Sequence, residues 1–449
     1  MKKSKLFSLL MVMVLAVFTA LTGCSSSGAG SENAEGGKEK SENWREKDPK
    51  EIKGEITFIS QRTDIVNTVF PEYAKEFQKK YPNVEVNFEA LTDYGGQITP
   101  RMNTEEYGDV LLLPTQVPIE DIPNFFEPLG SLKEMGEKYM GVEERAVDGT
   151  VYGIPVAITY NGVVYNKKVF EEAGINELPR TMDEFISALE KIKENTDAVP
   201  LYTNYAAGWP LTQWQGNVTT VAGDPAYSSQ TMVNGKDQLT EGKPQFELWN
   251  LMYDVAKKGL IEADPLTTDW ESSKAMIGKG EIATMVLGSW AIDQIKGVAE
   301  NPDDIGYMPF PTNADKVIFP LGADYQIGVN KHSESKEAAL AWVDWFIHES
   351  GYSVEQAGGI SAAKDVPLPE DLKKYEEQGV TFELLTPAKE GQEGLLDKID
   401  KEAEVGLWLE DKPKRIVEAA IGNRDESFKD IMAELNADWN EAYDKIVGK

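Results

Sequence analysis

The chain begins with an uncharged apolar run at residues 6–21 and then alternates short apolar strands with helical patterns. That first run is too short to cross a bilayer comfortably. Residues 55–60 predict a strand, and apolar side chains at every fourth position across 69–81 predict a helix. Residues 84–88 and 109–113 predict two further strands. Strands that alternate with helices indicate an α/β protein with a largely parallel sheet.

Two later helices have clear signals in the pattern. Thr181 and Glu184 are spaced as a capping box at the start of an apolar helical face. Toward the C-terminus, apolar residues from Phe428 to Ile446 follow one stripe, which predicts a long amphipathic helix. The sequence contains no internal repeat of the length typical of solenoids or propellers.

The first 23 residues have the organisation of a signal peptide, because lysines precede the apolar run and small residues follow it. The segment Leu-Thr-Gly-Cys at 21–24 resembles the lipobox of bacterial lipoproteins. This resemblance implies that the Cys24 thiol carries lipid, including palmitate, and anchors the protein to the extracytoplasmic face of the cell membrane. A chance cysteine near a cleavage site is the alternative. Residues 24–51 are mostly small, polar or charged, and they predict a flexible tether.

Charge and cysteine content narrow the classes of partner. The chain has 449 residues and a formal net charge of -31. Nucleic acids and anionic lipid surfaces are disfavoured as partners, because they bind clustered lysine and arginine. Cys24 is the sole cysteine. Once it is acylated, neither a disulfide nor a cysteine nucleophile is available.

Catalytic and metal-binding motifs are weak in this sequence. The two histidines, His332 and His348, lie in a polar turn and at a helix end, and neither neighbours a catalytic triad pattern. We therefore expect no metal, no cofactor and no enzymatic activity. Paired carboxylates for glycoside hydrolysis stay open as an alternative, because 76 acidic residues supply many pairs.

A family resemblance becomes specific at residues 149–174. The segments 149–155 (GTVYGIP), 162–170 (GVVYNKKVF) and 172–174 (EAG) resemble the crossover between domains in family 1 extracellular solute-binding proteins, the maltose-binding-like receptors of bacterial ABC importers. Further similar segments follow in the family's order at 179–185, 280–290 and 328–331. The likeness covers about residues 52–449.

The resemblance implies an α/β, two-lobed, periplasmic-binding-protein-like fold with crossing hinge strands. Lobe one is then expected at 52–157 plus 318–368, and lobe two at 158–317 plus 369–449. The two lobes of this family close on a ligand like a hinge.

Candidate ligand-binding residues follow the predicted strands, because ligands bind outside the carboxyl ends of parallel strands. The polar candidates are Arg62, Thr63, Asp64, Asp93 and Gln116. A helix cap is the alternative for Thr63 or Asp64, a solvated charge for Arg62, and a plain turn for Asp93. The family's crossing strands add Thr159, Tyr160, Asp324 and Tyr325.

Tryptophans are the second group of candidates, since pyranose rings stack on flat aromatic faces. Helical spacing among apolar neighbours assigns Trp249, Trp342, Trp345 and Trp439 to the core. Loop-like contexts instead favour ligand contact for Trp209, Trp214, Trp270, Trp290 and Trp408.

The resemblance thus implies a monomeric, lipid-anchored receptor that captures a neutral oligosaccharide and delivers it to the permease subunits of an ABC importer. Three alternatives stay open at this point. They are a surface-anchored glycoside hydrolase, a binding protein for a non-sugar solute, and the sensing partner of a surface receptor.

Overall fold

The first sheet begins with the three strands that the sequence predicts. The computed structural model describes residues 44–367 and 369–448. Strands β1 (Lys53–Ser60), β2 (Asn83–Ala90) and β3 (Val110–Leu112) are parallel, and β12 (Gln326–Val329) and β6 (Ile154–Pro155) extend the sheet in the order β2-β1-β3-β12-β6. The inward side chains of β1 are apolar and buried. Such a face has to be covered, and helices cover it here.

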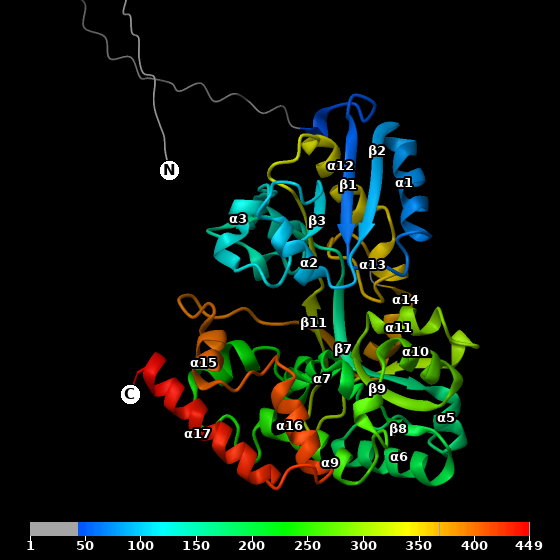
Figure 1. Cartoon of the computed structure of the whole chain (residues 1–449), viewed down its shortest axis with the longest axis vertical. Helices are drawn as coiled ribbons and strands as arrows, with labels where there is room; N and C mark the ends of the chain where they lie inside the picture. The colour runs from blue at the N-terminus through cyan, green and yellow to red at the C-terminus, as the bar shows by residue number, and fades with distance from the viewer. Residues whose placement is uncertain (1–43, 368, 449) are drawn as a thin grey trace, which may run out of the picture. The chain divides into compact units, whose positions relative to one another are not determined.

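Helices α1 (Val69–Lys80) and α12 (Lys336–His348) pack on this sheet (Figure 1). The predicted helix is confirmed: Tyr73 and Phe77 of the predicted apolar face are buried, while Phe70 is buried in place of the half-buried Val69. Pro71 lies in the first turn of α1, where a backbone N–H would have no intrahelical hydrogen-bond partner. The other elements near this sheet are α2 (Tyr94–Arg101), α3 (Ile122–Phe125), α4 (Leu132–Lys138), α13 (Tyr352–Glu355), β4 (Gly130–Ser131) and β5 (Thr150–Val151).

The second sheet is mixed. Its strands are β7 (Ile158–Asn166), β8 (Val199–Leu201), β9 (Ile282–Gly288), β10 (Ile305–Met308), β11 (Val317–Ala323) and β13 (Val380–Leu384). The order is β13-β11-β7-β9-β8, with β10 also paired to β7. Strand β7 is antiparallel to β9, β10 and β11. The expectation of a largely parallel sheet is therefore wrong here, because the chain enters and leaves this sheet in opposite directions.

The chain crosses between the two sheets, as the family resemblance implies. It passes from the first sheet to the second between β6 and β7, and it returns between β11 and β12 (Figure 1). This arrangement confirms an α/β, two-lobed fold with crossing strands. Strand β11 hydrogen-bonds within the second sheet, so the lobe boundary expected at residue 318 runs through a strand of that sheet.

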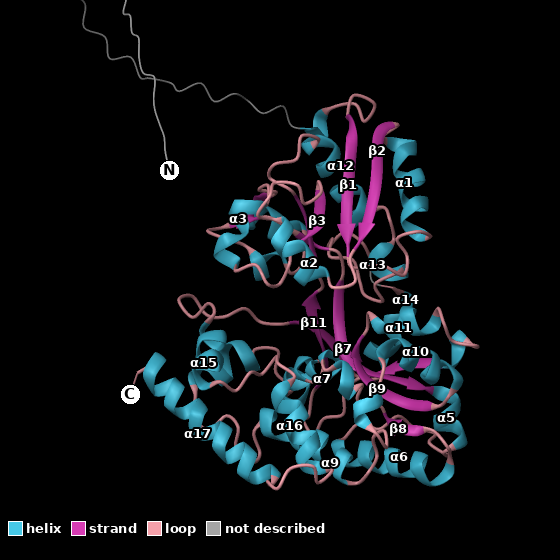
Figure 2. Cartoon of the chain, viewed as in Figure 1, coloured by secondary structure: helices cyan, strands magenta, loops and turns pink. Residues whose placement is uncertain are grey.

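Helices surround the second sheet (Figure 2). They are α5 (Lys167–Glu172), α6 (Met182–Asn195), α7 (Trp209–Thr212), α8 (Val218–Ala222), α9 (Pro244–Lys257), α10 (Trp270–Lys279), α11 (Ala291–Lys296), α14 (Glu370–Glu377), α15 (Leu395–Ala403), α16 (Asp411–Ala420) and α17 (Phe428–Ile446). The capping box of Thr181 and Glu184 is formed at α6, and α17 is the predicted terminal helix. The four tryptophans assigned to the core are all buried, which confirms that assignment.

The last residues of the expected tether contact the folded body. A short 3-10 turn spans Trp44–Glu46, the ring of Trp44 packs on the first core, and Arg45 Nη2 donates a hydrogen bond to Asp344 Oδ1 of α12 at 3.1 Å. The signal-peptide prediction and Cys24 lie outside the described residues. Within the described part of the chain, none of the helices is both long and apolar enough to span a membrane.

Candidate functional site

Three predicted tryptophans form one cluster, which we call the tryptophan cluster: Trp209, Trp270 and Trp290. Their ring centroids are 5.1 Å (Trp209 to Trp270), 5.7 Å (Trp209 to Trp290) and 5.8 Å (Trp270 to Trp290) apart. The residues come from the starts of α7 and α10 and from the residue before α11. Trp209 is 36% exposed and the other two are half-buried, so the cluster presents aromatic surface to solvent.

The end of β9 positions Trp290. The Ser289 backbone N–H donates to the Tyr160 carbonyl at 2.8 Å, and the Tyr160 N–H donates to the Ser289 hydroxyl at 3.2 Å. A Cβ on Gly288 would collide with the indole of Trp290. Hydrogen bonds to β7 and a glycine thus hold this tryptophan at the edge of the second sheet.

A buried arginine lies just after β1 and forms the charged part of the site. Arg62 is 8% exposed, and its guanidinium donates to both carboxylate oxygens of Asp64, at 2.9 and 2.8 Å. Its Nη1 also donates to the Tyr352 hydroxyl at 3.3 Å and to the Gln356 carbonyl at 2.6 Å. Burial raises the pKa of Asp64, but the hydrogen bonds and charge of Arg62 outweigh it and keep that pKa below its usual value.

Two side chains connect the arginine pair with the tryptophan cluster. The Lys274 ammonium lies 5.2 Å from the centre of the Trp270 ring, and its charge contributes to the lowered pKa of Asp64. Asp293 follows Trp290 by about one helical turn. Burial raises the pKa of Asp293, while the charges of Lys296 and Arg62 oppose that rise. The aromatic and charged groups therefore border one region.

The crossing strands contribute a further carboxylate, that of Asp324. The backbone N–H of Tyr325 donates to Asp324 Oδ1 at 2.7 Å. Burial raises the pKa of Asp324, and the Tyr325 hydrogen bond and the charge of Arg62 partly offset it. Because Arg62 acts on both Asp293 and Asp324, these carboxyl groups lie near the same guanidinium. Thr159 is half-buried in the β7–β11 pairing.

Tyr160 and Tyr325 have different surroundings from the tryptophans. The Tyr160 side chain is 4% exposed and packs against Tyr307 and Phe319, with ring centroids 5.5 and 5.0 Å away. Its backbone, not its ring, supports the tryptophan cluster. The half-buried ring of Tyr325 packs against Tyr94 at 5.8 Å.

Two other candidates have structural roles. Trp214 is 2% exposed and packs edge-on against Phe310 at 5.5 Å, so its ring belongs to the second core instead of the tryptophan cluster. Asp93 is exposed and caps α2 by accepting the Gly96 N–H at 3.2 Å, whereas the alternative left open by the sequence was a plain turn.

Three candidates lie on the surface. Thr63 and Gln116 are exposed. Trp408 is 53% exposed in the loop before α16. The carboxylate of Glu410, two residues later, approaches Gly208 next to Trp209, so this loop lies near the tryptophan cluster.

Sequence reasoning missed Lys274, Asp293 and Glu144. The helical spacing between Trp290 and Asp293 was a usable signal for the second of these. Glu144 lies in the 3-10 turn Val142–Arg145 and accepts the Ala323 N–H of β11 at 3.2 Å. Only the tertiary fold brings that turn to the crossing strands. No group of three or more potential metal ligands occurs among the described residues.

Glu144 should make stability depend on pH. Burial raises its pKa to about 7, against the opposing hydrogen bond from Ala323. The folded state thus binds this proton more tightly than the unfolded chain, and stability is lost as pH rises through the folded pKa. We expect Glu144→Gln to raise the free energy of unfolding by roughly 1 kcal/mol at pH 8 and by less at pH 5. The effect stays this small because part of the residue is exposed, where solvent screens its charge.

Urea unfolding of both proteins at the two pH values measures this difference. Glu137→Gln, on the exposed side of α4, removes the same charge and serves as the control. An equal effect of Glu144→Gln at both pH values would contradict the raised pKa.

Comparisons with known proteins agree with the fold. A family model described as bacterial extracellular solute-binding protein matches residues 64–351. An uncharacterized ABC transporter extracellular-binding protein of Pyrococcus horikoshii is 26% identical over 289 residues, which are 60% of this chain and 63% of that protein. The chain thus spans less than two thirds of the first curated relatives it matches. The diacetylchitobiose-binding protein of Streptomyces coelicolor is 28% identical over 337 residues, covering 71% of this chain and 74% of that protein.

Two solved structures from Bifidobacterium animalis subsp. lactis are similar along most of the chain. A manno-oligosaccharide-specific solute-binding protein in complex with mannotriose has a TM-score of 0.82 and 36% identity, covering 88% of this chain and 96% of that chain. An ABC transporter binding protein in complex with mannobiose has a TM-score of 0.83 and 36% identity, covering 91% and 100%. These relatives and neighbours are described as binding proteins.

Proposed function

The chain belongs to the family of bacterial extracellular solute-binding proteins, and from this premise we propose that it is the receptor of an ABC importer for a neutral oligosaccharide. The tryptophan cluster beside the Arg62–Asp64 pair carries this proposal. Indole rings bind the apolar C–H face of a pyranose, while carboxylates and a guanidinium hydrogen-bond its hydroxyl groups.

The charges of the site favour a neutral ligand. Arg62 already donates to Asp64, Tyr352 and Gln356, so no unbalanced positive charge awaits an anion there. The carboxyl groups of Asp293 and Asp324 accept hydrogen bonds from hydroxyl groups and disfavour acidic solutes. Manno-oligosaccharides are the first ligands to test, because proteins 36% identical to this chain were solved with mannobiose and mannotriose.

The ligand site of this proposal contains residues from both lobes. Lobe one supplies Arg62, Asp64 and Asp324, lobe two supplies the tryptophan cluster, and Trp408 extends the aromatic surface for a longer chain. We propose the expected lobes with one change, a return crossing at residues 324–325 instead of 318, because β11 pairs within the second sheet. Closure of the lobes would bring the hydrogen-bonding groups and the aromatic surface onto one ligand.

Isothermal titration tests the function. The panel contains mannobiose, mannotriose, diacetylchitobiose and maltotriose, with a dipeptide and a polyamine as non-sugar solutes. We expect saturable binding of at least one oligosaccharide and recovery of that sugar intact after incubation. Binding of only a non-sugar solute would reject the sugar assignment, and cleavage of the sugar would establish the glycoside hydrolase alternative.

We also propose that Cys24 carries the lipid anchor and that the protein works as a monomer at the outer face of the membrane. The tether that the sequence predicts at residues 24–51 would confine the receptor near its permease and raise its effective concentration there. This role would explain why a solute receptor carries a lipid anchor.

Cys24→Ala should separate anchoring from binding. We expect the variant to leave the membrane fraction, to bind oligosaccharide with unchanged affinity and to support uptake less efficiently. Fractionation, titration and uptake of labelled sugar measure the three properties. Retention of the variant in the membrane fraction after a salt wash would contradict anchoring through Cys24.

A further inference from the structure

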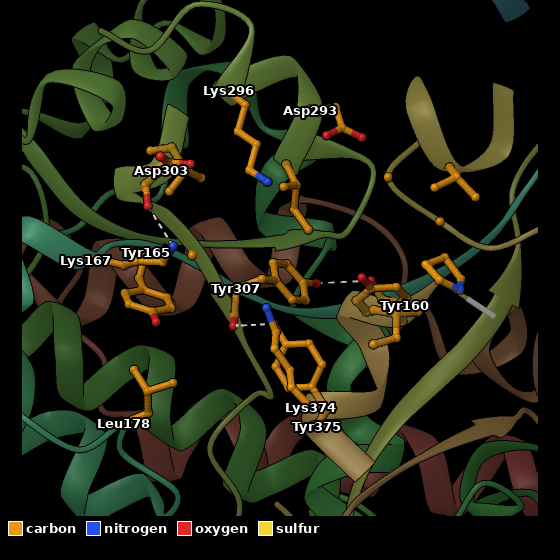
Figure 3. Close-up of a pocket in the computed structure, with 18 of the residues that line it drawn as sticks. Tyr160, Tyr165, Lys167, Leu178, Asp293, Lys296, Asp303, Tyr307, Lys374 and Tyr375 are labelled. Atoms are coloured by element: carbon orange, nitrogen blue, oxygen red, sulfur yellow. Dashed lines mark hydrogen bonds between the residues drawn. The ribbon is translucent and has the colours of Figure 1, made fainter. Parts of the chain in front are cut away.

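A cavity bordered by β7 is distinct from the tryptophan cluster. It has a volume of about 490 Å³, and β7, α5, α11, β10 and α14 contribute to its walls (Figure 3). None of the three clustered tryptophans lines it. Its aromatic wall includes Tyr307, whose hydroxyl donates to the Tyr160 carbonyl at 3.1 Å and to the Leu287 carbonyl at 2.8 Å. Asp293, which the oligosaccharide proposal uses, also borders this cavity, but the lysines of its wall have no role in that proposal.

Three lysines from three helices line the cavity: Lys167 of α5, Lys296 of α11 and Lys374 of α14. Figure 3 shows their side chains reaching toward the space around Tyr307. The Lys167 ammonium donates to the backbone carbonyl of Asp303 at 2.7 Å. Burial lowers the pKa of Lys167, and the charges of Lys374 and Lys296 lower it further. The ammonium groups of Lys296 and Lys374 are therefore each close enough to repel that of Lys167.

The carboxylates nearby do not pair with these lysines. Asp293 and Asp303 line the cavity. The charges of Asp303 and Asp304 raise the pKa of Lys167, but burial and the charges of Lys374 and Lys296 lower it by more. Asp293 also accepts the Gly358 N–H. Among side chains that the structure describes, no carboxylate oxygen lies within 4.0 Å of the ammonium nitrogen of Lys167, Lys296 or Lys374. Such a concentration of cations is unexpected in a chain of net charge -31.

We propose that this cavity is a binding site for a small free oxyanion of the phosphate class, separate from the oligosaccharide site. Ammonium groups bind phosphate oxygens as point charges through charge-assisted hydrogen bonds. A bound oxyanion relieves the repulsion among the three lysines, and it links α14 to α5 and α11. A neutral sugar would leave that repulsion in place.

Titration of the full protein with inorganic phosphate tests the site, at constant ionic strength set with sodium chloride. We expect saturable binding to the wild type. Lys296→Gln and Lys374→Gln should each weaken binding about threefold or more, and the double variant should abolish it. Lys168→Gln is the matched control, because Lys168 is adjacent in sequence, 65% exposed at its side chain and within 3.9 Å of Glu172. Its affinity for phosphate should equal that of the wild type.

Three results would overturn the proposal. The first is the absence of saturable phosphate binding to the wild type. The second is equal binding by all the variants, which would indicate a general salt effect. The third is displacement of phosphate by a bound oligosaccharide, which would merge the two sites. Because sugar titration of the lysine variants is a separate measurement, failure of the oxyanion site leaves the oligosaccharide proposal standing.

Discussion

Replacing Arg62 by alanine is expected to reduce oligosaccharide affinity at least about tenfold and to lower the free energy of unfolding by roughly 2 kcal/mol. The guanidinium makes hydrogen bonds to Asp64, Tyr352 and Gln356. Its removal leaves Asp64 without its counter-ion and leaves the half-buried Gln356 carbonyl without a donor. Isothermal titration and urea unfolding measure the two effects separately.

Arg101→Ala is the matched control for this variant. Arg101 forms an ion pair with Glu89 at 2.8 Å, but both side chains are exposed, so we expect a change of less than about 1 kcal/mol in stability and none in affinity. Arg62→Lys keeps a positive charge but loses the bidentate hydrogen bonds to Asp64. Full affinity in Arg62→Lys and Arg62→Ala alike would show that the guanidinium has no part in ligand binding.

Replacing Trp290 by alanine should cost about 1–2 kcal/mol of binding free energy, which is roughly a tenfold loss of affinity. Its ring lies within 6 Å of both Trp209 and Trp270, so truncation removes one aromatic surface and loosens its neighbours. Trp290→Phe retains a flat ring and should recover part of the loss. Titration with the best ligand of the panel measures these affinities.

Trp44→Ala separates loss of a ligand contact from general loss of packing. Trp44 is also half-buried, but it packs near α12 instead of in the tryptophan cluster. We expect this variant to lose some stability and to keep its affinity. If Trp290→Ala lowers stability as Trp44→Ala does and binds sugar like the wild type, Trp290 is a packing residue.

Much of the local structure could be predicted from the sequence. The structure contains the strands predicted at 55–60, 84–88 and 109–113 and the helix predicted over 69–81. They were predictable because burial of one side of a strand or helix requires apolar residues with a period of two or 3.6. The same patterns separated the four core tryptophans correctly. The mixed second sheet was not predictable from these patterns, since strand direction depends on where the chain crosses between sheets.

Single tryptophans in loops were harder to assign. Trp214 and Trp209 occur five residues apart in similar polar surroundings, yet one is buried against Phe310 and the other is exposed. Without a period, the sequence holds no information on which side of a loop faces the core. Asp93 presents the same difficulty, because a cap and a ligand contact use the same carboxylate.

By itself, the sequence determined the α/β class, the family and the residue types suited to a sugar site, because periodicity and ordered motifs are local properties of the chain. The tertiary structure decided which of those residues meet. It brought Arg62 together with Asp293 and Asp324, joined three distant tryptophans, and gathered Lys167, Lys296 and Lys374 around another cavity. Those contacts join residues far apart in sequence, and they depend on the crossing strands that hold two separate sheets in one fold.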